Sequence, residues 1–152
     1  MSSSLDLSEY ILQQKGPINS MKLQKLIYYS QAWSLALNGK PIFEEPIEAW
    51  KNGPVVRNLL EKTRNDYNIS SVSSGDPSLI DEDFQDTIIA VIIYYGQKSG
   101  QWLQNLVHSE EPWIEARRNA TKYKSLFSDI SYNVVISQEK MKDYYSSLNR
   151  LY

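Results

Sequence analysis

The chain has 152 residues, of which 22% are charged, carries a net charge of −2 at pH 7, and contains no cysteine. The lack of cysteine excludes disulfides, thiol nucleophiles and cysteine-ligated zinc, and a single histidine argues against His-rich metal sites. The length suits one domain with a real core, and no apolar run reaches the roughly 18 residues that a membrane helix needs.

Two helices are predicted before the first extended segment. The first covers residues 5–14 and ends at Gly16-Pro17, because proline cannot continue a helix. Asn19 then suits the N-cap of a long helix that ends at Asn38-Gly39. Along this second helix, apolar and small residues recur at i, i+3, i+4 and i+7, which predicts a stripe facing a core. The stripe consists of Leu23, Leu26, Ile27, Ser30, Trp33, Ser34 and Leu37. We expect this helix to be central.

A small β element is predicted around residues 42–51. Pro41 and Pro46 argue against a helix here, and the sequence at residues 47–50 favours extended structure. Asn52-Gly53 is typical of a turn, and Pro54 suits the first position of a helix that continues to about residue 65. The polar stretch that follows, to residue 78, is predicted to be a loop.

The second half of the chain is predicted to be mostly helical. Residues 81–95 form an apolar helix that stops at Gly96, and Ser99 is the expected cap of a helix over residues 100–108. A further helix begins at the sequence Ser109-Glu110-Glu111-Pro112, where the acidic pair suits the positive end of the helix dipole.

The C-terminal part ends in one more helix. Residues 129–136 fit no single pattern, with extended structure favoured at 133–136, and Ser137 caps the last helix. The predicted fold class is therefore mainly α. We expect a single compact helical domain over residues 1–152, with about six to seven helices and the small β element.

No catalytic motif is evident in the sequence, which lacks the nucleophile-elbow, zinc-protease, phosphate-loop and dinucleotide-binding patterns. Glu44, Glu45 and Glu48 could serve acid–base chemistry only in a cleft that shifts one pKa, and on a short strand they are more often solvated. His108 is interpreted as a structural histidine at a helix C-terminus rather than as a general base. We expect no catalytic residue, cofactor or metal, and a small enzyme that uses these four side chains is the least favoured hypothesis.

The charge distribution shows no basic stripe of the kind that follows nucleic acid. Basic residues form two small groups, at 57–64 and 117–124, which we interpret as solvated helix faces. The first residues also lack the basic and then apolar pattern of a secretory leader. We therefore expect a cytoplasmic protein whose partner is neither a membrane nor a nucleic acid.

The four tryptophans have different interpretations. Trp33 and Trp102 fall on helical stripes, which favours the core. Trp50 and Trp113 lie near turns and helix starts, where an indole can either pack or anchor a partner, because tryptophan is enriched in interface hot spots.

The chain also has three pairs of adjacent tyrosines, at residues 28–29, 94–95 and 144–145. Neighbouring residues cannot share one face of a helix. Each of these helices therefore either lies between two neighbours, which we favour, or presents an aromatic face to a protein partner.

Two sets of residues form motifs that helix spacing does not account for. The first runs from Lys22-Leu23-Gln24-Lys25-Leu26 through Tyr28-Tyr29 and Gly39-Lys40-Pro41 to Glu48-Ala49-Trp50-Lys51-Asn52-Gly53-Pro54-Val55-Val56. The second is Leu106-Val107-His108-Ser109-Glu110, followed by Pro112-Trp113. In this order the motifs resemble the Panacea domain, the SocA-like antitoxin family that also occurs in phage-associated proteins of the GepA type. The resemblance covers about residues 5–118.

The resemblance implies a non-enzymatic role. Members of the family are antitoxins that neutralise an adjacently encoded toxin, largely by binding it directly, and the same domain is paired with unrelated toxins. We therefore expect a cognate toxin protein as the partner. The alternative with the same fold and motifs is a prophage-associated adaptor that delivers a client protein to a protease.

Two positions depart from the family pattern. Asn52 stands where the family commonly has an aromatic residue, which changes the surface beside the turn, and Val107 replaces the usual threonine. The residues expected to define the motifs or to bind the partner are Tyr29, Trp33, Glu48, Trp50, Lys51, Gly53, Pro54, His108 and Trp113.

Overall fold

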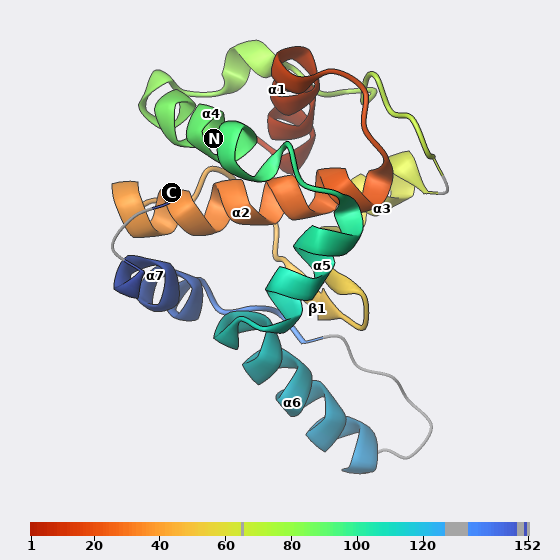
Figure 1. Cartoon of the computed structure of the whole chain (residues 1–152), viewed down its shortest axis with the longest axis vertical. Helices are drawn as coiled ribbons and strands as arrows, with labels where there is room; N and C mark the ends of the chain where they lie inside the picture. Colours follow the sequence, from red (N-terminus) through yellow and green to blue (C-terminus); the bar gives the residue numbers. More distant parts are fainter. Residues whose placement is uncertain (65, 127–133, 149–150, 152) are drawn as a thin grey trace.

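The long second helix, α2, is the centre of the computed structural model, and the other elements pack around it (Figure 1). The structure describes residues 1–64, 66–126, 134–148 and 151, with the backbone alone at 121–126. In chain order these residues form α1 (Ser4–Lys15), α2 (Ser20–Asn38), β1 (Glu48–Trp50), β2 (Gly53–Val55), α3 (Arg57–Thr63), the short 3₁₀ helix η1 (Pro77–Leu79), α4 (Glu82–Tyr95), α5 (Gly100–His108), α6 (Glu111–Leu126) and α7 (Gln138–Ser147). The predicted fold class, mainly α with a small β element, is confirmed.

Both ends of α2 form as the sequence predicts. The Asn19 side chain accepts a hydrogen bond of 2.8 Å from the backbone N–H of Lys22, and Gly39 adopts the left-handed conformation with φ 72°. Every residue from 23 to 35 is buried, so α2 is enclosed on all sides rather than along one stripe. Leu37, predicted to face the core, is instead 53% exposed, because it lies in the last turn, beyond this buried stretch.

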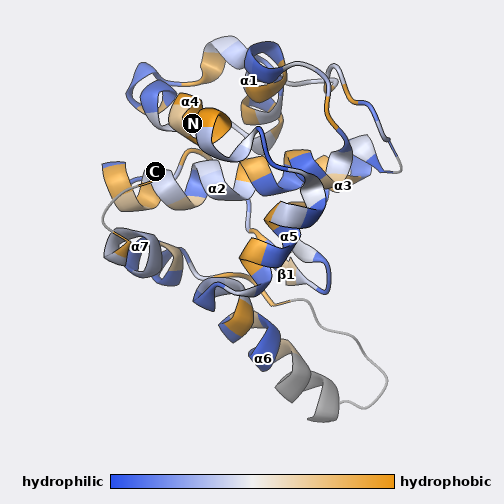
Figure 2. Cartoon of the chain, in the orientation of Figure 1, coloured by the Kyte–Doolittle hydropathy of each residue, from blue (hydrophilic) through white to orange (hydrophobic). Residues whose placement is uncertain are grey.

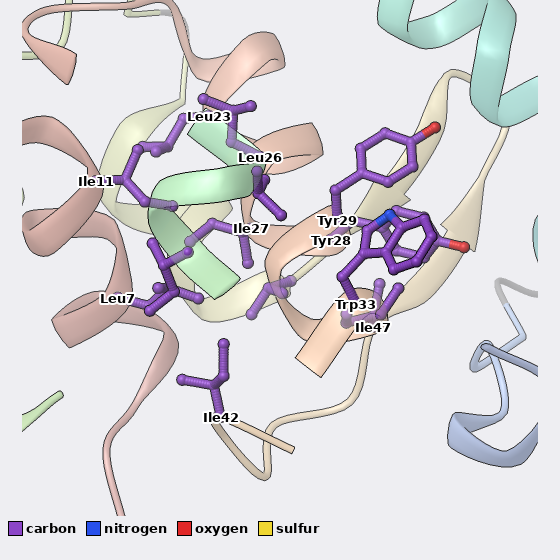
Figure 3. Packing of buried hydrophobic residues seen from close by; sticks show 14 of the residues in the cluster. Leu7, Ile11, Leu23, Leu26, Ile27, Tyr28, Tyr29, Trp33, Ile42 and Ile47 are labelled. Carbon is purple, nitrogen blue, oxygen red and sulfur yellow. The ribbon is translucent and has the colours of Figure 1, made fainter. Parts of the chain in front are cut away.

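The apolar core occupies two sides of α2. On one side Ile11 and Leu7 of α1 face Leu23 and Ile27, and on the other lie the aromatic rings of Tyr29 and Trp33 (Figure 3). Apolar residues recur along α2 and on the adjoining α1 and α4 (Figure 2). The packing of α2 is most extensive against α7 and α4, so this helix of the first half of the chain is covered mainly by helices of the second half.

Side-chain caps begin most of the other helices. At α1, Ser3 and Asp6 form a capping box, in which each side chain accepts a hydrogen bond from the backbone N–H of the other residue. Asp81 caps α4. Ser99 and Ser137 cap α5 and α7, which confirms both predictions.

The β element is a hairpin that extends past the predicted segment 42–51. β1 and β2 pair antiparallel, with Ala49 opposite Pro54. The prediction that Pro54 begins a helix is wrong, because this residue lies in β2 and α3 begins at Arg57. Proline has a fixed φ that suits a short edge strand as well as a first helical turn, so its signal in the sequence was ambiguous.

A third extended segment lies along the other edge of β1. The Ala49 N–H donates to the carbonyl oxygen of Val134 at 2.8 Å, and the Ile136 N–H donates to the carbonyl of Ile47 at 2.7 Å. The extended structure favoured at 133–136 is therefore confirmed for residues 134–136. The rest of the ambiguous stretch, residues 129–133, lies outside the described residues.

Exposure differs from the prediction at one tryptophan. Trp102, expected in the core, is 40% exposed, and the Lys98 ammonium lies 4.7 Å from the centre of its ring.

In the predicted loop, Ile69 is buried and pairs with Ile18 through two backbone hydrogen bonds. Within the described part of the chain, no helix combines the length and the apolar character that crossing a lipid bilayer requires.

Candidate functional site

The side chain of Gln24 fastens the hairpin to α2. Its amide oxygen accepts a hydrogen bond of 2.9 Å from the Val56 N–H, and its amide nitrogen donates to the Val56 carbonyl at 3.1 Å. Gln24 is 5% exposed, so these bonds satisfy polar groups that have little access to water. The N-terminal half of α2 therefore fixes the position of the chain where β2 ends.

Gly53 allows the hairpin turn to approach α2 closely. Its φ of 136° is a conformation that residues with a Cβ rarely adopt. A Cβ at this position would also lie 3.3 Å from Cε and 3.4 Å from Nζ of Lys25. The Lys25 side chain thus lies directly against the turn, and the residue is only 3% exposed.

The end of α5 and the start of α6 contact the hairpin through its backbone. The Trp113 indole N–H donates to the Trp50 carbonyl at 2.9 Å, and the Arg117 guanidinium donates to the Ala49 carbonyl at 3.0 Å. His108 stacks on Trp113, with 4.1 Å between ring centres and an interplanar angle of 15°. The two sequence motifs therefore meet at β1.

Glu110, between α5 and α6, is a buried carboxylate held by tyrosines. It is 5% exposed, and its Oε1 accepts hydrogen bonds from the hydroxyls of Tyr29 at 2.7 Å and Tyr145 at 2.8 Å. The Tyr28 hydroxyl lies 3.0 Å from that of Tyr145. Burial raises the pKa of Glu110, and the two tyrosine bonds oppose that rise. This network joins α2, α7 and the α5–α6 junction.

At the base of the hairpin, Glu48 forms an ion pair and orients Trp50. Its Oε2 lies 2.6 Å from Nε of Arg57, and its Oε1 accepts a hydrogen bond of 3.0 Å from the Trp50 indole. The Arg57 guanidinium carbon lies 5.3 Å from the centre of the Trp50 ring, within cation–π range. These contacts hold a half-buried indole in one orientation.

A groove of about 310 Å³ separates the start of α2 from the hairpin turn. Its lining is mainly apolar and includes Met21, Trp50, Pro54 and Leu60. Lys25 also lines this groove. Burial lowers the pKa of the Lys25 amine from its usual 10.5 to about 8, because the ammonium is removed from water.

The structure brings most of the expected site residues together. Seven of them lie on the hairpin or at the α5–α6 junction: Glu48, Trp50, Lys51, Gly53, Pro54, His108 and Trp113. Tyr29 and Trp33 lie in the core, with exposures of 0% and 1%. Tyr29 supports the junction through Glu110, and the Trp33 indole donates to the Tyr95 hydroxyl at 2.9 Å.

The side chains considered for catalysis do not form a shared site, because each has different surroundings. Glu45 accepts a hydrogen bond of 2.7 Å from the backbone N–H of Ser4, and Glu48 is paired with Arg57, whereas Glu44 is exposed. Burial lowers the pKa of His108, and the positive charges of Lys25 and Arg117 lower it further. Among the described residues, no three side chains of His, Cys, Asp or Glu are placed to hold a metal ion.

Sequence reasoning gave no role to several residues that shape the site. Gln24, Lys25 and Glu110 stand within the motifs. Gln24 and Lys25 could have been noticed in the sequence because they are two adjacent polar residues inside a strongly apolar helix. Tyr145 carries no local signal, because its partners Tyr28 and Glu110 lie 117 and 35 residues away.

The model of the family described as antitoxin SocA-like, Panacea domain, matches residues 23–114, which is more than half of the chain. The chain belongs to this family. The Panacea match begins inside α2 and ends in the first turn of α6, so it contains the hairpin, the second motif and all of the first motif except Lys22. α7, which supplies Tyr145 to the network behind the site, lies outside the match. The comparisons with curated proteins and with solved structures gave no match.

Proposed function

We propose that the chain is an antitoxin that neutralises a cognate toxin protein by binding it directly, with no catalytic step of its own. The observation that carries this proposal is the match of the Panacea family model to residues 23–114. The convergence of both motifs on a single hairpin supports it, because the residues expected to bind a partner lie close together on a well-supported element.

The proposed contact surface is the hairpin turn, the groove beside it and the nearby half-buried aromatics. Lys51 and Asn52 are exposed at the turn, and Trp50 and Trp113 are half-buried. A stable protein complex needs roughly 800 Å² from each partner, so the contact must extend from the groove onto neighbouring helices. The mechanism is steric: the antitoxin covers the surface that the toxin uses.

The test begins with the reading frame next to the gene for this chain. Its product is expressed alone and together with the chain, and growth is followed. We expect expression alone to stop growth and co-expression to restore it. The two purified proteins should also form a complex in size-exclusion chromatography, and the toxin should be inactive in that complex without any protease.

Two results would contradict the proposal. Growth arrest that co-expression does not relieve, with no complex formed, would remove the antitoxin role. Rescue that occurs only in cells with an intact protease, while the purified complex remains toxic, would favour the adaptor that delivers a client for degradation.

A further inference from the structure

Lys25 differs from the other buried charged residues in the described part of the chain. Asp6, Glu48 and Glu110 are each at most 9% exposed, and each accepts hydrogen bonds from backbone or side-chain donors. Lys25, at 3% exposure, forms no hydrogen bond or ion pair with any described residue. Buried charges are normally paired, since an unpaired ammonium in the protein interior is unfavourable.

The position of this ammonium is fixed by two elements. Lys25 extends from α2 beneath the hairpin turn, where a Cβ on Gly53 would lie 3.4 Å from Nζ. The same side chain lines the groove of about 310 Å³, next to the apolar surfaces of Trp50 and Met21. The groove therefore combines one positive charge with apolar walls, a combination that fits a ligand with one negative charge and an apolar portion.

Among the residues that the structure describes, no carboxylate pairs with this ammonium. Burial lowers the pKa of Lys25 to about 8. At pH 7 the amine is still mostly protonated. The electrostatic interaction between Lys25 and His108 is repulsive, since the Lys25 charge contributes to the lowered pKa of the imidazole. Lys51 adds a second positive charge at the exposed edge of the groove.

We infer that this groove binds an aspartate or glutamate side chain of the partner protein, with an adjacent apolar side chain of the partner packed against Trp50 and Met21. The inference rests on the proposed function, because it specifies the chemistry of the protein that the antitoxin recognises. The partner's carboxylate accepts hydrogen bonds from Lys25 Nζ, and such charge-assisted bonds are stronger than neutral ones when water is excluded. Most of the lysine is already removed from water in the free protein, so the complex gains the ion pair with little further loss of lysine hydration.

The experiment uses the full chain and no toxin. A library of random seven-residue peptides, fused to phage through their C-termini, is selected on the immobilised protein. This fusion offers side-chain carboxylates only and leaves no free C-terminal carboxylate in the library. We expect the selected peptides to contain Asp or Glu beside an aromatic or aliphatic residue.

The selected sequence is then synthesised with an amidated C-terminus, and its affinity is measured by calorimetry. We expect Lys25→Met to weaken binding at least tenfold and Lys22→Met to leave it within twofold. Lys22 is the matched control, because it lies one turn away on α2 and does not line the groove. Changing the peptide's acid to its amide should weaken binding to the wild-type protein tenfold and leave binding to the Lys25→Met variant unchanged.

Several outcomes would overturn the inference. These are a selection that yields no acidic peptides, peptides that bind Lys25→Met as well as the wild-type protein, or an acid-to-amide change without effect on the wild-type protein. The last comparison alters only the peptide, so it tests the need for a carboxylate even if the Lys25→Met variant does not fold. Because the growth experiment uses no Lys25 variant and the selection uses no toxin, the inference and the proposed function can fail independently.

Discussion

Replacing Lys25 with methionine should stabilise the protein near neutral pH. Methionine has an unbranched side chain one atom shorter than that of lysine, and it removes the charge that burial disfavours. The pKa of the amine is about 8 in the folded protein and 10.5 ordinarily. That difference of about 2.5, at roughly 1.36 kcal/mol for each pKa unit, corresponds to about 3 kcal/mol of destabilisation by Lys25 at pH 7.

The pH dependence of this effect has a definite sign. The folded-state pKa lies below the unfolded one, so the penalty is fully present below pH 8 and fades as the pH rises toward 10.5. The free energy of unfolding is measured by urea denaturation of the wild-type protein and of Lys25→Met at several pH values from 6 to 10.5. We expect the variant to be more stable by up to about 3 kcal/mol at pH 7, and the difference to shrink toward zero at pH 10.5.

Taking the difference in stability between the wild-type protein and Lys25→Met removes effects that both proteins share, such as ionisation of tyrosines at high pH. Lys22→Met serves as the control, because Lys22 is only partly buried and should give a much smaller difference. A Lys25→Met protein that is less stable than wild type at pH 7, or a difference that does not change with pH, would refute the reasoning. Either result would mean that the ammonium is satisfied within the fold.

Three further predictions concern the elements that support the site. Gly53→Ala should lower the free energy of unfolding by about 1–3 kcal/mol, because alanine rarely adopts a φ of 136° and its Cβ would press on Lys25; an unchanged urea midpoint would contradict this. Gln24→Ala should lower the free energy of unfolding by about 1–3 kcal/mol for each of the two Val56 backbone groups that it leaves buried without a partner, measured by the same urea denaturation. A decrease below about 0.5 kcal/mol would show that water takes the place of the amide. Glu110→Gln should remove one source of pH-dependent stability. Burial raises the pKa of this carboxyl, so the free energy of unfolding of the wild-type protein falls as the pH rises from the unfolded-state pKa to the folded-state pKa. The stability of the variant relative to wild type should increase over the same pH interval. A stability difference for Glu110→Gln that is constant from pH 4 to 8 would contradict the last prediction.

The local parts of the fold were predictable from the sequence because their causes are local. Asn19, Ser99 and Ser137 cap the helices that follow them, and Gly39 ends α2 in the left-handed conformation. Each of these effects needs only a few neighbouring residues. The long helix was also correctly expected to be central.

The errors arise where the outcome depends on distant parts of the chain. Pro54 is compatible with a helix start and with a short strand, and its pairing with Ala49 decides between them. Trp102 lies on an apolar face of α5, but the elements around α2 leave that indole 40% exposed. The burial of Lys25 could not be predicted either, since it requires the hairpin turn to lie over α2.

The hydrogen bonds that attach the hairpin to α2 and α6 are made by its main chain. The carbonyls of Ala49 and Trp50, and both backbone groups of Val56, carry the hydrogen bonds to α2 and α6. The side chains of Lys51 and Asn52 at the tip take no part in those bonds and are exposed. Mutation can therefore alter the chemistry of the tip while the loop keeps its shape, and a lineage of such proteins could acquire new targets without first rebuilding its scaffold.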